Sequence, residues 1–181
     1  MRWLMRGGGV ALSLMLVAGC GLFGGHTRPA SKLPDQITIA SKAFDRGDNI
    51  PARFTCKGQG VSPPLQWSGV PADAKELALV LDDPDAPGGT FVHWVVFRID
   101  PSRASIHPGA APPHAREAKN SAGKVGYFPP CPPKGTHHYR FTMYALDEHT
   151  DLPEGVGLRK ALDTISARAT SHGRMVGTFG S

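Results

Sequence analysis

The stretch Leu81-Asp-Asp-Pro-Asp-Ala-Pro87, followed by Phe91-Val-His-Trp94, joins the two strongest strand candidates of this 181-residue chain. Three carboxylates crowd into a loop that two prolines stiffen, so like charges repel one another without contributing to a core. A chain that needed only a hairpin would use Asn-Gly or Asp-Gly here. The composition of the loop therefore indicates that its aspartates serve a site.

Strand-like patterns surround this loop. Residues 76–81 and 91–99 are dense in Val, Leu and aromatic side chains, which is typical of strands buried on both faces. Residues 37–39 and 139–146 alternate in polarity and predict further strands. Weaker extended segments are expected at 48–56, 65–67 and 175–179.

The rest of the pattern is mostly irregular. Residues 101–135 are rich in proline and predict a long excursion, which in a compact domain is usually functional or disordered. One amphipathic helix is expected over 158–171, because apolar residues recur there at helical spacing: Leu158, Leu162, Ile165 and Ala169. The chain is therefore expected to be mainly β with one clear helix.

Composition excludes some functions. The length suits one domain, and 22 glycines with 17 prolines indicate many turns rather than long helices. The formal net charge is +5, but no block of Lys and Arg and no basic helical face is present. Nucleic-acid binding is therefore not expected.

The N-terminus has the pattern of a processing segment. Arg2 and Arg6 precede an apolar run over 7–17 that is too short to span a membrane. The run ends in Leu16-Val-Ala-Gly-Cys20, which resembles a bacterial lipobox, where the Cys is lipidated and becomes the first mature residue. The alternative is a secretory peptide with an unrelated Cys. We expect a lipoprotein signal peptide over 1–19 and a lipid on Cys20.

Residues 20–35 lack periodicity and predict a flexible tether, so the folded domain is expected to be 36–181. Loss of the signal with its two arginines lowers the net charge from +5 to +3, which implies no particular partner. The expected location is the bacterial cell envelope, at the outer membrane or in the periplasm of a Gram-negative cell. Gly21, rather than Asp, follows the Cys and leaves the outer membrane open as a destination.

Histidines and carboxylates can converge on one site. Asp83, Asp85 and His93 flank a single connection, and a second cluster with His137 and Tyr139 introduces another strand. Carboxylates beside imidazoles raise the histidine pKa, so a cation would be available for a phosphate monoester or diester, with the tyrosine as a further donor. The alternative is structural: the aspartates cap a turn and the histidine is a satisfied sheet residue.

Several motifs appear in order along the chain. They are Ser62-Pro-Pro-Leu-Gln-Trp-Ser-Gly-Val-Pro71, Asp82-Asp-Pro-Asp-Ala-Pro87, His93-Trp94, Asn120-Ser-Ala-Gly, Gly126-Tyr127, Pro130-Cys-Pro-Pro133 and His137-His-Tyr-Arg-Phe141. Together they resemble the phosphatidylethanolamine-binding protein family, in its bacterial Raf kinase inhibitor-like (YbhB/YbcL) branch. The resemblance runs from about residue 36 to the end of the chain.

The resemblance implies a Greek-key antiparallel β-sandwich with one or two peripheral helices and a small anion pocket at one end. By position, the pocket residues would be Asp83, Asp85, Pro87, His93, His137 and Tyr139, and the proline-rich stretch 130–133, with Pro130 and Cys131, would form a further wall.

Two positions depart from the family pattern. His138 replaces the usual Arg, exchanging a permanent cation for a titratable one. Pro129 replaces the usual Gly, removing a backbone donor and fixing φ. Either change is expected to weaken or alter the binding of the anion. Neither is expected to remove the pocket.

With Cys20 assigned to a lipid, Cys56 and Cys131 remain as a pair in an oxidising compartment. A disulfide between them would attach the proline-rich excursion to the segment 48–56. The alternative is two buried thiols.

The leading functional hypothesis is a lipid-anchored envelope protein that binds a small anion, such as a phosphate or a phospholipid headgroup, without catalysis. The alternative is a hydrolase in which Asp85 and His93 act on a phosphoester or ester, although no catalytic motif of a known class occurs. A third hypothesis is a regulator of an unknown protein partner. No cofactor is expected, and no metal, because the usual ligand spacings are missing.

Overall fold

The computed structural model describes residues 33–181. The predicted signal peptide, Cys20 and the tether up to residue 32 lie outside the described residues. No helix within 33–181 is long and apolar enough to cross a membrane.

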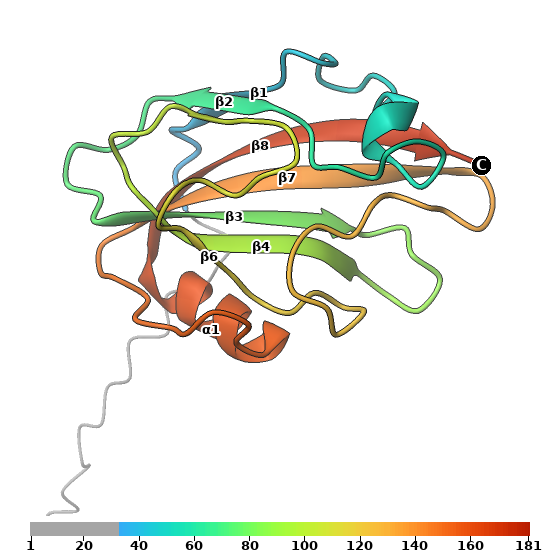
Figure 1. The fold of residues 1–181 in the computed structure, drawn as a ribbon. Coiled ribbons are helices and arrows are strands. Elements are labelled where there is room, and N and C mark those ends of the chain that lie inside the picture. Colours follow the sequence, from blue (N-terminus) through green and yellow to red (C-terminus); the bar gives the residue numbers. More distant parts are fainter. Residues whose placement is uncertain (1–32) are drawn as a thin grey trace, which may run out of the picture.

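Two antiparallel sheets make up most of the described chain (Figure 1). The large sheet has the order β6-β4-β3-β7-β8, with the bounds Arg116–Glu117, Phe91–Ile99, Glu76–Asp83, Thr136–Leu146 and Ala169–Gly180. The small sheet has the order β1-β2-β5, with the bounds Thr38–Ala40, Leu65–Ser68 and Ser105–Ile106. The helix α1 spans Leu158–Arg168, and a single 3₁₀ turn, η2, spans Ala52–Phe54.

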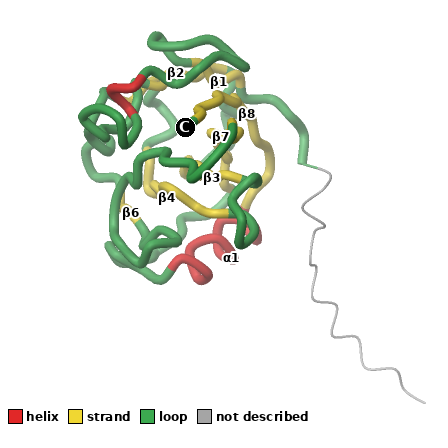
Figure 2. Tube along the Cα trace, turned by 90° about the vertical axis from the view of Figure 1, so that its right-hand side faces the viewer, coloured by secondary structure: helices red, strands yellow, loops and turns green. Residues whose placement is uncertain are grey.

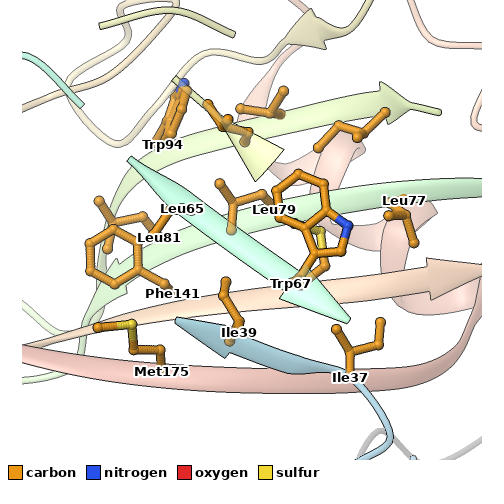
Figure 3. Close-up of a cluster of buried hydrophobic side chains, with 14 of the residues drawn as sticks. Ile37, Ile39, Leu65, Trp67, Leu77, Leu79, Leu81, Trp94, Phe141 and Met175 are labelled. Carbon is orange, nitrogen blue, oxygen red and sulfur yellow. The ribbon is translucent and has the colours of Figure 1, made fainter. Parts of the chain in front are cut away.

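The large sheet is covered on both faces. Viewed from the strand ends, the small sheet and α1 lie on opposite sides of it (Figure 2). One face packs against the small sheet through a cluster that includes Trp67, Leu79 and Phe141 (Figure 3). The other face packs against α1 through residues such as Val95 and Ile165. Because the central strands β3 and β4 lie between these two layers, both of their faces need apolar side chains.

The mainly β antiparallel sandwich predicted from the sequence is confirmed, and so are strands at 76–81, 91–99 and 139–146. The segment 48–56 was predicted as extended, and this is wrong for most of its length, because it contributes one bridge at Asn49 and then the turn η2. The excursion over 101–135 is irregular, as expected, except for the two-residue strands β5 and β6.

The last strand is longer than the sequence predicts, and the helix is shorter. The helix ends at Arg168, where Ala169 takes an extended conformation and begins the twelve-residue strand β8. The inward residues of β8 include Gly173 and Gly177, so apolar alternation is weak there. A Cβ at Gly173 would lie 1.6 Å from the carbonyl oxygen of Ile37, and one at Gly177 would lie 2.6 Å from the Phe44 ring. Glycine is therefore needed at these two positions, because the N-terminal segment packs too closely against β8 to leave room for a side chain.

Candidate functional site

The site forms where β3 ends and β4 and β7 begin. Alternation along β3 turns Asp83 towards the small sheet and Asp82 towards the opposite face, where Arg140 of β7 binds it. Asp83 pairs in register with Phe91 of β4. On β7, His137 and Tyr139 share the inward face with Asp83.

A β-bulge brings His93 into the same group. Leu81 pairs with Trp94 and the next residue, Asp82, pairs with Val92, so His93 is an extra residue without a partner on β3. A bulge of this kind redirects a side chain and interrupts strict alternation. As a result, His93 and Trp94, although adjacent, are both buried on the inner side of the sheet.

These strand ends enclose a cavity of about 160 Å³. Six of the residues expected at the site line it: Asp83, Pro87, His93, Cys131, His137 and Tyr139. Asp85 and Pro130, which were also expected there, do not line it. The carbonyl oxygen of Pro130 instead accepts a hydrogen bond from the Cys56 N–H at 3.0 Å.

Pro132 and Pro133, which belong to the expected proline-rich wall, also line the cavity, whereas sequence reasoning did not identify three further lining residues, Ala86, Phe91 and Phe128. The rings of Phe91 and Phe128 lie 4.8 and 6.0 Å from the His93 ring, centroid to centroid. Phe91 could have been found from its position two residues before His93 on the same strand. Phe128 has no such signal, since its place depends on how the irregular excursion folds back.

Asp83 and His137 form a buried pair. His137 Nδ1 lies 2.7 Å from Asp83 Oδ2, and both side chains are less than one tenth exposed. The other carboxylate oxygen, Oδ1, accepts the Asp85 N–H at 2.8 Å. Asp83 therefore both closes the turn and orients the imidazole of His137. The turn-capping role and the site role, which the sequence analysis gave as alternatives, are both filled by this residue.

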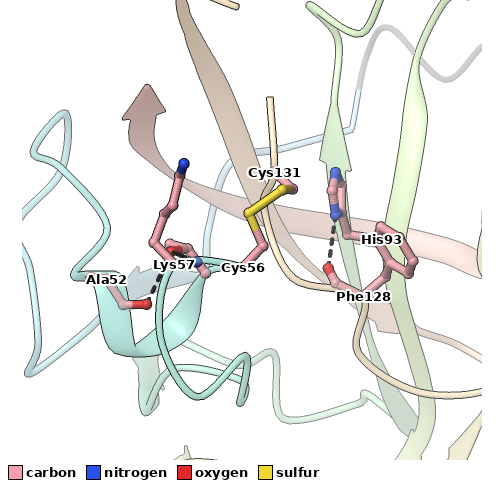
Figure 4. The surroundings of a disulfide bond; sticks show 7 residues. Ala52, Cys56, Lys57, His93, Phe128 and Cys131 are labelled. Carbon is pink, nitrogen blue, oxygen red and sulfur yellow. Dashed lines mark hydrogen bonds between the residues drawn. A yellow bond between two sulfur atoms is a disulfide. The ribbon is translucent and has the colours of Figure 1, made fainter. Parts of the chain in front are cut away.

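His93 donates to the backbone through Nδ1, which lies 2.8 Å from the Phe128 carbonyl oxygen (Figure 4). Burial lowers the pKa of His93 below its usual value, and this outweighs the opposing effects of the Phe128 carbonyl and Asp83. The expectation that neighbouring carboxylates would raise the histidine pKa is therefore wrong for His93, because desolvation is the larger effect. In the neutral ring with its proton on Nδ1, Nε2 is a hydrogen-bond acceptor.

Two polar atoms at this cavity are buried without a hydrogen-bond partner in the described chain: His93 Nε2 and the Tyr139 hydroxyl. Burial raises the pKa of Tyr139, and Asp83 and Asp85 raise it further, so the phenol keeps its proton and can donate. Most buried polar groups in proteins are paired with protein or ordered water, so these two atoms are available to bind a ligand or water in the cavity.

Asp85 lies outside this group. Its Oδ2 accepts the N–H of His138 and lies 2.8 Å from His138 Nδ1, and this contact lowers the pKa of Asp85. Both side chains are largely exposed. His138, which stands where the family usually has Arg, thus forms a pair with Asp85 at the surface. Within residues 33–181 no hydrogen bond joins Asp85 to His93. Pro129, the other departure, packs near Gly60 and does not line the cavity.

A disulfide joins Cys56 to Cys131 beside the cavity (Figure 4). It links the loop after η2 to the wall that carries Cys131. The segment over 128–133 is therefore attached to the rest of the domain by the disulfide, by the Pro130 carbonyl and by the backbone N–H of Phe128, which donates to the His93 carbonyl.

A larger cavity of about 400 Å³ lies between α1 and the large sheet, lined mainly by apolar residues such as Val80, Leu158 and Ile165. Its one carboxylate, Asp82, is paired with Arg140. No group of three or more His, Cys, Asp or Glu residues in the described part of the chain is arranged to hold a metal ion. Of these two cavities, the smaller one at the strand ends therefore has the polar groups suited to binding a ligand.

Comparisons with known proteins agree with this fold. The chain is 44% identical to "Putative lipoprotein LppC" of Mycobacterium tuberculosis, over 94% of this chain and 92% of the relative. Its structure is similar to the crystal structure of Chlamydia trachomatis CT736, described as a "Putative PhosphatidylEthanolamine-Binding Protein (PEBP) Homolog", with a TM-score of 0.76, 36% identity, and 81% and 99% of the two chains covered. It is also similar to the crystal structure of Escherichia coli YbcL, with a TM-score of 0.75, 26% identity and the same coverage. The model of the family described as "Phosphatidylethanolamine-binding protein" matches residues 40–180, and the chain belongs to this family.

Proposed function

We propose that the protein is a binding protein for a small oxyanion, of the phosphate or phosphate-monoester class, held in the cavity at the strand ends. The observation that carries this proposal is the pair of buried, unpaired polar atoms, His93 Nε2 and the Tyr139 hydroxyl. A ligand that satisfies both atoms removes the cost of burying them without partners.

The two atoms differ in what they require. Neutral His93 accepts at Nε2, whereas Tyr139 donates. A phosphate or monoester that retains one P–OH group satisfies both, since the P–OH donates to His93 and a charged oxygen accepts from Tyr139. If His93 is protonated instead, its Nε2–H donates to a fully ionised ligand. In either case one proton lies between His93 and the ligand. A neutral histidine and a fully ionised phosphate therefore take up one proton when they form the complex.

The charge of Asp83 leads to the same dependence on protons. An anion beside this carboxylate is repelled, so a ligand form that retains a proton and carries less charge is favoured over the dianion. Binding is therefore favoured as the pH falls below neutrality. The aromatic and proline walls exclude water and strengthen these interactions.

A lipid anchor places this site in the cell envelope. The motif ending in Cys20 supports lipidation, and so does the similarity along almost the whole chain to LppC, which is named as a lipoprotein. We propose that the domain is attached to a bacterial membrane through this lipid. A phospholipid headgroup and free phosphate share the same phosphoryl chemistry, and the experiment below separates them.

The test follows histidine resonances of the purified protein by NMR during titration with inorganic phosphate and with phosphoethanolamine. We expect saturable shifts of His93 and His137. Tyr139→Phe removes only the hydroxyl and should weaken binding by roughly ten- to a hundredfold, the value of a hydrogen bond to a charged group. Tighter binding of phosphoethanolamine than of phosphate would identify a headgroup-like ligand, and the reverse would identify free phosphate.

Two controls accompany this titration. His138→Gln changes a histidine outside the cavity and should leave the affinity unchanged. Tyr139→Phe should fold at least as stably as the parent, because it removes a buried hydroxyl that has no partner. If neither anion produces a saturable shift, or if Tyr139→Phe binds like the parent, the proposal is wrong. Ester turnover that is lost in His93→Ala would show a hydrolase instead.

A further inference from the structure

We propose that a second cavity, separate from the anion site, binds a small alkylammonium group against the carboxylate of Glu117. This cavity has a volume of about 230 Å³. Its chemically distinctive residues are Trp94, Glu117 and Tyr127, and the rest of its lining comes from the loops at 60–62 and 109–111 and from Gly126. No residue lines both this cavity and the anion site.

Glu117 is held firmly in place. It belongs to the edge strand β6, its backbone N–H donates to Glu154 Oε2 at 2.8 Å, and its carbonyl oxygen accepts the Gly155 N–H at 2.8 Å. Its Oε1 accepts the indole N–H of Trp94 at 2.5 Å. The indole nitrogen points away from the apolar cluster that the rest of the Trp94 ring joins (Figure 3).

Within the described residues the Glu117 carboxylate has no countercharge. None of the ion pairs formed within residues 33–181 includes Glu117, and no Lys, Arg or His side chain lines this cavity. A neutral glutamine could also accept a hydrogen bond from Trp94, although a weaker one, so the bond alone does not require a charge. A partly buried carboxylate without a cation is unfavourable, and a bound cation would compensate it.

The walls favour an organic cation over a metal ion. The rings of Trp94 and Tyr127 meet edge to face, with centroids 5.7 Å apart and planes at 87°. Aromatic rings attract ammonium groups and their alkyl substituents, whereas Mg²⁺ and Ca²⁺ prefer several oxygen ligands. Oε2 of Glu117, which has no hydrogen bond within the described residues, is available to an ammonium N–H.

Space for the ligand is left next to the carboxylate. Gly126 adopts φ +96°, and a Cβ there would lie 3.7 Å from Glu117 Oε1. A side chain at this position would be strained and would cover the carboxylate. The conformation of the 126–127 segment therefore keeps the site open while Tyr127, whose hydroxyl donates to the Phe54 carbonyl at 2.6 Å, forms its wall.

The experiment titrates the purified, ¹⁵N-labelled full chain with methylammonium chloride and follows the indole N–H resonances. We expect a saturable shift of Trp94 with a dissociation constant of about 10 mM, near the limit for a ligand with so few non-hydrogen atoms. The indole of Trp67, which lies outside this cavity, is expected to stay unchanged. Sodium chloride at matched concentrations should not reproduce the shift of Trp94.

Two matched variants locate the site. Glu117→Gln keeps an acceptor for Trp94 but removes the charge, and we expect its affinity to fall at least tenfold. Glu148→Gln removes a carboxylate that neither lines the cavity nor contacts Glu117, and its affinity should stay within about twofold. Absence of saturation in the parent, an equal shift with sodium chloride, or equal losses in the two variants would overturn the proposal. Each result is independent of phosphate binding, which is followed at His93.

Discussion

In His93, burial and hydrogen bonding give the two ring nitrogens different roles. Nδ1 is fixed by the Phe128 carbonyl, so only Nε2 can gain or lose a proton in the folded protein. Burial disfavours the cation more strongly than Asp83 favours it. The residue thus enters the folded state as a neutral acceptor, which is why a ligand that carries a hydroxyl proton matches it.

The lowered pKa of His93 predicts how stability depends on pH. Below about pH 6.5 the unfolded chain binds a proton at this histidine more readily than the folded chain does. The free energy of unfolding should therefore decrease as the pH falls below about 6.5, by at most about 1.4 kcal/mol per pH unit from this group, until the lower folded pKa is passed. Urea unfolding between pH 7 and pH 5 measures the slope.

His93→Asn is the matched variant for this measurement, because its amide can still donate to the Phe128 carbonyl but does not titrate. Its slope should be shallower than that of the parent over the same range. Equal slopes in the two proteins would show that His93 does not contribute to the pH dependence.

At the scale of an element, β8 shows where sequence patterns fail. Strands β3 and β4 were predicted because burial on both faces fills them with Val, Leu and aromatic residues. Strand β8 is buried on one face largely through small residues, and its glycines are needed because another segment approaches too closely for a side chain. An intrinsic β-propensity cannot reveal this, since the constraint comes from residues more than 120 positions away.

Gly173→Ala tests this explanation of β8. The new Cβ would overlap the Ile37 carbonyl, a backbone atom that cannot move without displacing β1. We expect the free energy of unfolding to fall by about 3 kcal/mol or more, as for other overpacked core positions. Gly88→Ala is the control, since a Cβ at Gly88 meets nothing within 4 Å and should change stability by less than about 1 kcal/mol. Similar losses in both variants by thermal or urea unfolding would contradict the packing argument.

At the scale of the whole molecule, the sequence was sufficient for the sandwich and for naming most of the residues that line the cavity at the strand ends. Asp83 and His93 are separated by one turn, so their proximity follows from local pattern. His137 and Tyr139 were expected as a second cluster at the start of a strand, and the family motifs supported placing the two clusters in one pocket. Of the two expected residues that do not line the cavity, Asp85 and Pro130, the place of Asp85 depends on a tertiary contact, because its carboxylate is bound by His138, where the family usually has Arg. The wall residue Phe128 likewise depends on the path of a proline-rich segment, which has no periodicity to interpret.

The disulfide between Cys56 and Cys131 is the long-range bond that fixes the path of the proline-rich segment 128–133. It closes a loop with a sequence separation of 75 residues, so its removal should lower the free energy of unfolding by about 2–4 kcal/mol. Because Cys131 lines the anion cavity, the same change should loosen the 128–133 wall and weaken phosphate binding. Cys56→Ser/Cys131→Ser is compared with the parent by urea unfolding and by phosphate titration.

Alkylation and mass analysis of the native parent should find neither cysteine reactive before reduction. Two alkylated thiols, or a double variant as stable as the parent, would show that the wall is held by the Pro130 and Phe128 backbone bonds alone.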